Sequence, residues 1–212
     1  MQRSAKIALV VCVAVVVLGS FGFWWFVLRD PAPPEAALRV GPDGTTVGSV
    51  PESVDGTWTV ISGEDDVFVG YRIMELFAAD TVKKEAVGRT TAVEGSLTID
   101  GTTVTEVTIT ADLRELTSDQ MPRDNIIRRE GLESDTFPDA TFVLTEPIEL
   151  PTTPEVGVTY DVTATGELTL HGVNRPVTIQ LQATWAGATI EVAGKTRIVL
   201  ADFDIEPIAI PM

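Results

Sequence analysis

The stretch VTYDVTATGELTL, residues 158–170, decides the fold of this chain. Its even-numbered positions are apolar or small, and its odd-numbered positions carry threonine, aspartate or glutamate. This period of two, kept over the whole stretch, predicts a long β-strand with one apolar face and one solvated face.

The segments around this strand repeat the pattern and are separated by turn signals. Alternation returns at residues 177–185 and 188–192, after the turn sequences GVNRP and AG. Upstream, Asp100-Gly101 separates two alternating segments, residues 91–99 and 103–113, and Asp-Gly in that setting is a strong hairpin signal. Four more strands are expected at residues 58–62, 67–74, 141–146 and 197–205.

These strands predict an all-β domain. A sheet with one apolar face must bury it, and closing the sheet on itself both buries that face and removes the exposed edges. Strands of this length favour a tall barrel over a sandwich of short strands. We therefore expect an extended antiparallel barrel of about eight strands over residues 55–212.

One segment departs from the β pattern. Residues 118–131 read SDQMPRDNIIRREG. Asp119 is a candidate N-cap, Pro122 suits a first helical turn, and Gly131 suits a helix end. We expect one short helix here, across an end of the barrel.

The first 54 residues predict a membrane anchor and a spacer. Residues 7–28 carry no charge, and such a length crosses a hydrocarbon core of about 30 Å. Arg3 and Lys6 precede this segment, which places the N-terminus in the cytoplasm and the barrel outside it, on a single-pass membrane protein. A cleaved signal peptide is the alternative, although its apolar region is normally shorter. Residues 30–54 are rich in proline and glycine and predict a flexible linker after the anchor, which covers residues 1–29.

Composition excludes several classes of function. The net charge is -16 at pH 7, which disfavours binding to nucleic acid. The only cysteine, Cys12, lies in the apolar segment, so no internal disulfide can form and a cysteine zinc site is excluded. We expect no cofactor and no metal, and the sequence leaves the formation of a dimer open.

Two motifs give the domain a resemblance to a known family. The residues from Met121 to Phe142 contain an RD…FP…F pattern, and residues 166–177 read GELTLHGVNRPV. Together, in this order and spacing, they resemble the signatures of the YceI-like domain. The resemblance implies a lipocalin-like barrel, an extracytoplasmic location and binding of an isoprenoid-type lipid, such as a polyprenyl chain or a quinone tail. Residues 64–71 depart from the family's usual first strand, and the predicted anchor departs from its many secreted members.

Interior positions of such a barrel alternate along each strand and would line a dry cavity for an apolar ligand. Barrels of this size can instead fill their interior with side chains, and both outcomes remain open at this point. Tyr160 could offer a hydroxyl group to a headgroup, or only pack in the core. The candidate ligand-binding residues are Phe68, Val93, Leu97, Val107, Ile109, Phe142, Leu144, Tyr160, Val162, Leu168, Ile179, Leu181 and Ile190.

A basic cluster stands out in this acidic domain. Arg123, Arg128 and Arg129 could hold a phosphate or carbonyl headgroup at the mouth of the barrel. The alternative is that they pair with acidic neighbours in the same segment, Asp124, Glu130 or Glu133.

Binding or carriage of an isoprenoid lipid is therefore the leading hypothesis for the function. The second is a non-enzymatic envelope protein with a filled core that displays acidic loops to a partner. Catalysis is the weakest, and we expect no catalytic residues. The single histidine, His171, lies in a predicted turn, and no G-x-S-x-G motif surrounds Ser134.

Overall fold

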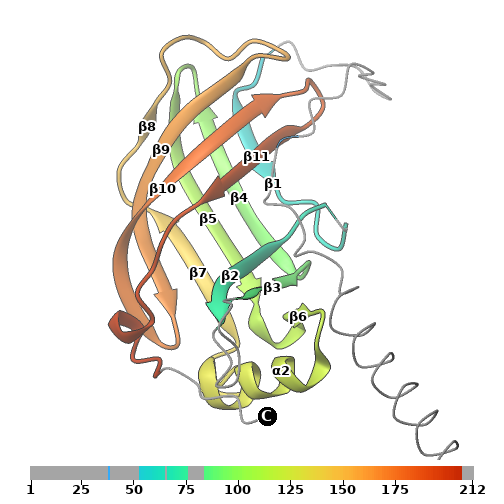
Figure 1. Cartoon of the computed structure of the whole chain (residues 1–212). Helices are drawn as coiled ribbons and strands as arrows, with labels where there is room; N and C mark the ends of the chain where they lie inside the picture. Colours follow the sequence, from blue (N-terminus) through green and yellow to red (C-terminus); the bar gives the residue numbers. More distant parts are fainter. Residues whose placement is uncertain (1–37, 39–52, 65, 76–83, 207–212) are drawn as a thin grey trace, which may run out of the picture. The chain divides into compact units, whose positions relative to one another are not determined.

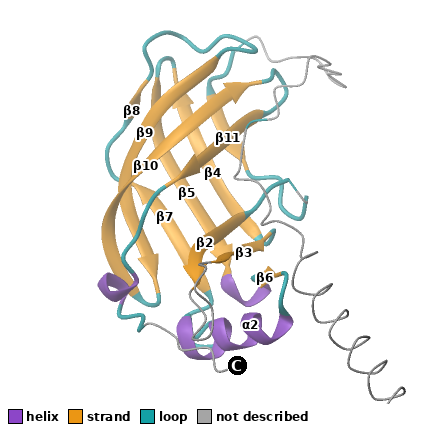
Figure 2. Cartoon of the chain, in the orientation of Figure 1, coloured by secondary structure: helices purple, strands orange, loops and turns teal. Residues whose placement is uncertain are grey.

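Two antiparallel sheets organise the domain in this computed structural model, which describes residue 38 and residues 53–64, 66–75 and 84–206. The larger sheet has the strand order β1-β4-β5-β7-β9-β10-β11, with β8 paired to β5, and the smaller one has the order β2-β3-β6. Figures 1 and 2 show the two sheets. The strands are β1 (Gly56–Thr59), β2 (Val69–Glu75), β3 (Lys84–Thr90), β4 (Val93–Asp100), β5 (Thr103–Asp112), β6 (Thr117–Ser118), β7 (Asp139–Leu144), β8 (Ile148–Glu149), β9 (Thr159–Leu170), β10 (Val173–Trp185) and β11 (Ile190–Lys195).

The long hairpin of β9 and β10 forms as the alternation predicts. Twelve residue pairs join the two strands, from Val173 opposite Leu170 to Thr184 opposite Thr159. Positive backbone angles at the turn, φ 52° at His171 and φ 72° at Gly172, reverse the chain within two residues. The Asp100-Gly101 hairpin between β4 and β5 forms as well, with Gly101 at φ 60°.

The large sheet curls into a half-barrel (Figure 1), which differs from the expected single closed barrel of eight strands. In the described part of the chain, no strand pairing joins β1 to β11, and β2 pairs with β3 in the separate small sheet. The two ends of the large sheet approach each other through side chains instead. Trp185 and Ile190 from one end share an apolar cluster with Trp58 and Ile99 from the other.

The helical segment lies where the sequence predicts it. A short helix, α2 (Met121–Ile126), has Pro122 in its first turn and continues directly into a π-helical turn, η2 (Ile127–Gly131). The residue that caps α2 is Gln120, not Asp119 as expected. Asp119 forms an ion pair with Arg123 instead, which removes it from the capping position.

The predicted strand at residues 197–205 is wrong. A 3-10 turn, η3 (Leu200–Phe203), occupies this segment and ends at Asp204, whose φ is 56°. The turn places both Phe203 and Ile205 in an apolar cluster with Leu113, and this packing outweighs the local β pattern. A second 3-10 turn, η1 (Leu113–Glu115), follows β5.

The predicted anchor at residues 7–28 lies outside the described residues, as does the linker except for Leu38, Ser53 and Val54. Within the described part of the chain, no helix combines the length and apolar character needed to cross a membrane. Val54 is 2% exposed and packs with Ile99 and Trp185, so the packed domain already includes this residue.

Candidate functional site

Strand register brings together twelve of the thirteen predicted ligand-binding residues. Directly opposed residues on neighbouring strands project from the same face of a sheet. Leu97 opposes Val107 between β4 and β5, and Ile109 opposes Phe142 between β5 and β7. Phe142 in turn opposes Leu168 on β9.

The same register continues to the other end of the sheet. Val162 opposes Leu181 between β9 and β10, and Trp185 opposes Ile190 between β10 and β11. We call the common surface the inner face. It carries Val93, Leu97, Val107, Ile109, Phe142, Leu144, Tyr160, Val162, Leu168, Ile179, Leu181 and Ile190.

The opposite face of the sheet is polar, as expected from the alternation. Threonine hydroxyl groups form hydrogen bonds across strands, at 3.1 Å between Thr110 and Thr141 and at 2.8 Å between Thr159 and Thr184. Gln182 donates to Asp161 over 2.9 Å. The two faces therefore differ sharply in polarity, and the apolar face lies inside the curl of the sheet.

The inner face is only partly buried. Among its twelve predicted residues, Val93 and Phe142 are buried, at 3% and 9% exposure, and the other ten keep intermediate exposure. Val192, which opposes Ala183 on this face, is 49% exposed at the β11 edge. The face thus presents apolar area that the protein's own side chains do not cover.

Glycines on the inner face determine how the large side chains next to them lie. A Cβ atom at Gly95 would lie 2.8 Å from Ile109 Cδ1, and one at Gly194 would lie 2.2 Å from Leu181 Cδ2. These large side chains therefore lie sideways over a glycine of the neighbouring strand. A side chain that lies along the sheet fills less of the interior than one that projects from it.

Phe68 lies apart from the other predicted residues. It precedes β2, and the guanidinium carbon of Arg89 on β3 lies 4.1 Å from the centre of its ring. Both strands belong to the small sheet, so Phe68 is not part of the inner face of the large one.

The hydroxyl group of Tyr160 already has protein partners. It accepts a hydrogen bond from the backbone N–H of Glu155 over 3.2 Å, and it lies 3.4 Å from the carbonyl oxygen of Thr153. These contacts tie the start of β9 to the preceding loop. The ring contributes to the inner face, while the hydroxyl group serves the loop.

The three predicted headgroup arginines lie in two different settings. Arg123 is 4% exposed, pairs with Asp119 and donates to Ser118 Oγ. Arg128 and Arg129 instead line an open pocket of about 310 Å³. Burial therefore separates Arg123 from the other two arginines.

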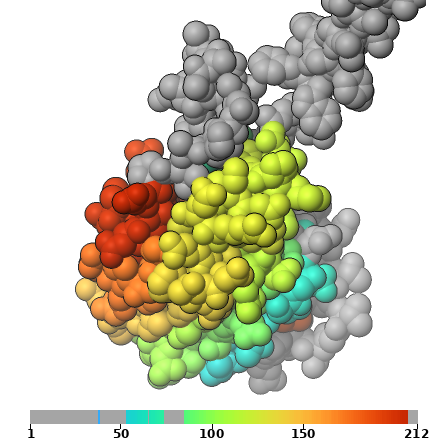
Figure 3. Space-filling view, turned by 90° about the horizontal axis from the view of Figure 1, so that it is seen from below, coloured from blue at the N-terminus to red at the C-terminus, as the bar shows by residue number. Residues whose placement is uncertain are grey.

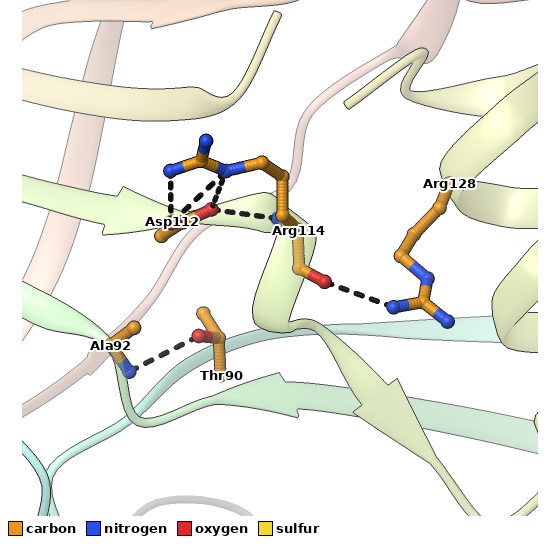
Figure 4. A network of polar contacts seen from close by, with 5 residues as sticks. All are labelled: Thr90, Ala92, Asp112, Arg114 and Arg128. Carbon is orange, nitrogen blue, oxygen red and sulfur yellow. Dashed lines mark hydrogen bonds and ion pairs between the residues drawn. The ribbon is translucent and has the colours of Figure 1, made fainter. Parts of the chain in front are cut away.

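Arg114, which sequence reasoning missed, also lines this pocket. It follows β5 and donates from Nη2 to Asp112 Oδ2 over 2.7 Å, as Figure 4 shows. This hydrogen bond holds the pKa of the Asp112 carboxyl group below its ordinary value and raises the pKa of Arg114. No sequence motif marks Arg114, because its place in the pocket depends on the approach of η2 to the end of β5.

Segments around α2 and η2 cover one end of the molecule. In the view of Figure 3, from below, the yellow and yellow-green surface of this region fills the centre, with the C-terminal described residues in red beside it. Leu132, just after η2, packs against the cluster of Leu113, Leu170 and Phe203. Apolar packing therefore closes the half-barrel at this end.

His171 stabilises the structure next to this cluster. Its Nδ1 lies 3.2 Å from the carbonyl oxygen of Phe203 and its ring makes an edge contact with Phe137. Among the described residues, no group of three or more His, Cys, Asp or Glu side chains could hold a metal ion.

Comparison with known proteins identifies the family of this chain. The model of the YceI-like domain matches residues 43–211. The UPF0312 protein VPA0850 of Vibrio parahaemolyticus is 32% identical over 127 residues, which cover 56% of this chain and 64% of that protein. The UPF0312 protein Ent638_1570 of Enterobacter is 34% identical over 123 residues, 53% of this chain and 59% of that protein. The match thus spans less than two thirds of these relatives.

Two solved structures are also similar. One is a polyisoprenoid binding domain from Saccharophagus degradans implicated in plant cell wall breakdown, with 22% identity, a TM-score of 0.48, and coverage of 66% of this chain and 75% of that one. The other is the YceI protein of Campylobacter jejuni, with 17% identity, a TM-score of 0.48, and coverage of 65% and 78%. Since the family model matches most of the chain, this protein belongs to the YceI-like domain family.

Proposed function

We propose that the inner face binds the hydrocarbon chain of an isoprenoid-type lipid, such as a polyprenyl chain or a quinone tail. The single observation that carries this proposal is the partial exposure of ten apolar side chains on one concave face. Apolar area facing water inside a curved sheet is unfavourable, and an apolar ligand that covers it gains free energy.

The gross free-energy gain from covering this face grows with the length of the lipid tail. Burial of each methylene group is worth about 0.8 kcal/mol, so a tail of tens of carbons offers a gross gain on the order of 20–30 kcal/mol. Ordering the tail and losing its translational freedom offset much of this. A long isoprenoid gains more from such a face than a short lipid does.

The proposed setting of this function is the outer side of a membrane. Residues 7–28 would anchor the chain, and residues 30–54 would let the domain reach lipid in the outer leaflet. The basic residues Arg3 and Lys6 support a cytoplasmic N-terminus. The domain would then carry or sequester the lipid without chemical change.

Binding can be tested with the full-length chain in a non-ionic detergent and a fluorescent polyprenyl probe. We expect saturable binding that an unlabelled polyprenyl lipid displaces, and lipid mass spectrometry should find an isoprenoid in the purified protein. A filled core, as in a non-enzymatic envelope interaction protein, would give no displaceable binding and no co-purified isoprenoid. These two negative results together would contradict the proposal.

Orientation needs a separate test. Thr178 is exposed on the polar face, so a Thr178→Cys substitution in a Cys12→Ser background offers one accessible thiol. A membrane-impermeant maleimide should label this thiol in intact spheroplasts. Labelling only after lysis would place the domain in the cytoplasm.

A further inference from the structure

The pocket beside η2 lies outside the inner face and is lined by polar residues. We call it the arginine pocket, and its lining residues are Arg114, Asn125, Arg128, Arg129, Ser134 and Asp135. Its volume of about 310 Å³ exceeds that of a phosphate or pyrophosphate group. None of its six residues belongs to the inner face, so its role is separate from that of the apolar surface.

Arg128 is fixed by neutral oxygen atoms. Its Nε donates to the carbonyl oxygen of Asp124 over 3.3 Å, and its Nη1 donates to the carbonyl oxygen of Arg114 over 3.0 Å. Its Nη2 donates to Asn125 Oδ1 over 3.2 Å. Figure 4 shows the contact with Arg114.

These three contacts orient the guanidinium group without neutralising it. Among the described residues, no carboxylate pairs with Arg128, and three of its five N–H groups are used. Two N–H groups remain, one on each terminal nitrogen, on a side chain whose position is already fixed. A preorganised guanidinium group of this kind suits a phosphate oxygen.

The residues that line the pocket carry a net positive charge. Arg129 is exposed and, within the described residues, has no hydrogen bond or ion pair. Arg114 is neutralised by Asp112, and Asp135 is the one acidic side chain in the pocket lining. Arg128 and Arg129 together therefore outweigh Asp135, in a protein whose net charge is -16.

We propose that the arginine pocket binds a phosphate-type anion through Arg128 and Arg129. The anion would compensate the charge of two arginines that no carboxylate among the described residues pairs with. The chemistry is shared by free phosphate or pyrophosphate and by the phosphorylated headgroup of a lipid. Arg123, which the sequence groups with these two residues, takes no part, because it is buried and paired with Asp119.

The test is calorimetric titration of inorganic pyrophosphate into the full-length chain in non-ionic detergent at low ionic strength. Wild-type protein should bind it saturably. Arg129→Gln should weaken binding about ten-fold, because a charge-assisted hydrogen bond and its charge are lost. Since no hydrogen bond or ion pair joins the Arg129 side chain to another described residue, the variant should fold normally.

Arg197→Gln is the matched control. Arg197 is exposed, has no hydrogen bond or ion pair among the described residues, and carries the same charge outside the pocket. Its substitution should change pyrophosphate affinity less than about two-fold, as expected for screened surface charge. Absence of saturable binding to wild type, or equal weakening by both substitutions, would overturn the proposal.

A third variant, Arg128→Lys, keeps the charge but not the fixed planar fork, and should also weaken binding. Titration with a prenyl pyrophosphate then identifies the source of the anion. If Arg129→Gln weakens both ligands, the pocket takes a lipid headgroup; if it weakens only inorganic pyrophosphate, the pocket takes a free anion. Substitutions on the inner face, such as Ile179→Gln, should leave the affinity for inorganic pyrophosphate unchanged. The lipid-binding proposal and the anion-binding proposal can therefore fail independently of each other.

Discussion

The ring of Phe142 occupies the space above Gly166. A Cβ atom at Gly166 would lie 2.5 Å from Cζ of Phe142 and 2.3 Å from the carbonyl oxygen of Val143. Phe142 is thereby buried along the sheet, and the strand beside it, β9, contributes no bulk at this point. The same arrangement recurs at Gly95 and Gly194, so small residues on the inner face let large ones lie flat.

This relationship predicts that Gly166→Ala destabilises the domain. The added methyl group must displace the Phe142 ring or shift β7, which typically costs about 1–3 kcal/mol for overpacking in a core. Urea unfolding of the full-length chain measures the change. Thr163→Ser, on the polar face of the same strand, keeps the hydroxyl group that donates to Gln180 over 3.2 Å; it is the control and should change stability by less than about 0.5 kcal/mol. Equal stability of Gly166→Ala and wild type would show that the Phe142 ring does not fill the space above Gly166.

The polarity of the two faces predicts a position-specific effect on lipid binding. Ile179→Gln places an amide on the inner face and should weaken binding of the polyprenyl probe about ten-fold or more, because a buried amide without a partner is costly. Thr178→Gln introduces the same side chain on the exposed polar face and should have little effect. Fluorescence titration compares the two. If Thr178→Gln weakened binding more than Ile179→Gln did, the lipid would lie on the polar face and the proposed binding surface would be wrong.

The contact between Asp112 and Arg114 predicts a pH-dependent contribution to stability. Hydrogen bonding from the Arg114 side chain lowers the pKa of folded Asp112 below its unfolded value. The contribution is therefore present above the unfolded pKa and is lost as pH falls through the folded pKa. Asp112→Asn keeps an oxygen acceptor but loses the charge. Its destabilisation should be small at pH 7, because the pair is partly exposed, and it should shrink as the pH falls through the folded pKa of Asp112.

Chemical denaturation of both proteins over a pH series from 7 down to about 2 checks this prediction. The quantity to compare is the difference in unfolding free energy between wild type and Asp112→Asn. A difference that grows as the pH falls would contradict the assignment of the lowered pKa.

His171 should matter for stability and not for binding. Its Nδ1 contacts the carbonyl oxygen of Phe203, and its backbone adopts a φ of 52°. His171→Asn keeps a residue that tolerates this backbone region but loses the ring contacts, so stability should fall by about 1–2 kcal/mol. Affinity for the polyprenyl probe should be unchanged in the folded protein. A large loss of affinity at constant stability would instead give His171 a direct role at the ligand.

Long alternating segments were the most predictable part of the fold. The expected strand at residues 158–170 differs from β9 by one residue at its start, because buried or partly buried positions alternate with more exposed polar positions along most of its length. β3 was missed for the opposite reason. Ala86, Val87 and Gly88 are buried one after another, so the middle of this strand shows no alternation of apolar and solvated positions.

The sequence predicts which residues of the candidate site share one face of a strand, because that depends only on a period of two. Alternation correctly assigned twelve residues to the inner face but failed for Phe68. A period of two within a predicted strand does not say which sheet that strand joins, and residues 67–74 belong to the small sheet or its edge. The arginine pocket was only partly visible in the sequence. Arg128 and Arg129 are adjacent in the chain, whereas Arg114 joins them through tertiary packing.

The most direct measurement is photo-crosslinking of a diazirine-bearing polyprenyl lipid to the full-length chain, with the labelled residues mapped by mass spectrometry. We expect adducts on inner-face residues of several strands, such as Leu144, Val162 and Leu181, all of which keep accessible apolar area. Adducts confined to the polar face, or to residues 7–28, would contradict the claim that the half-barrel holds the lipid.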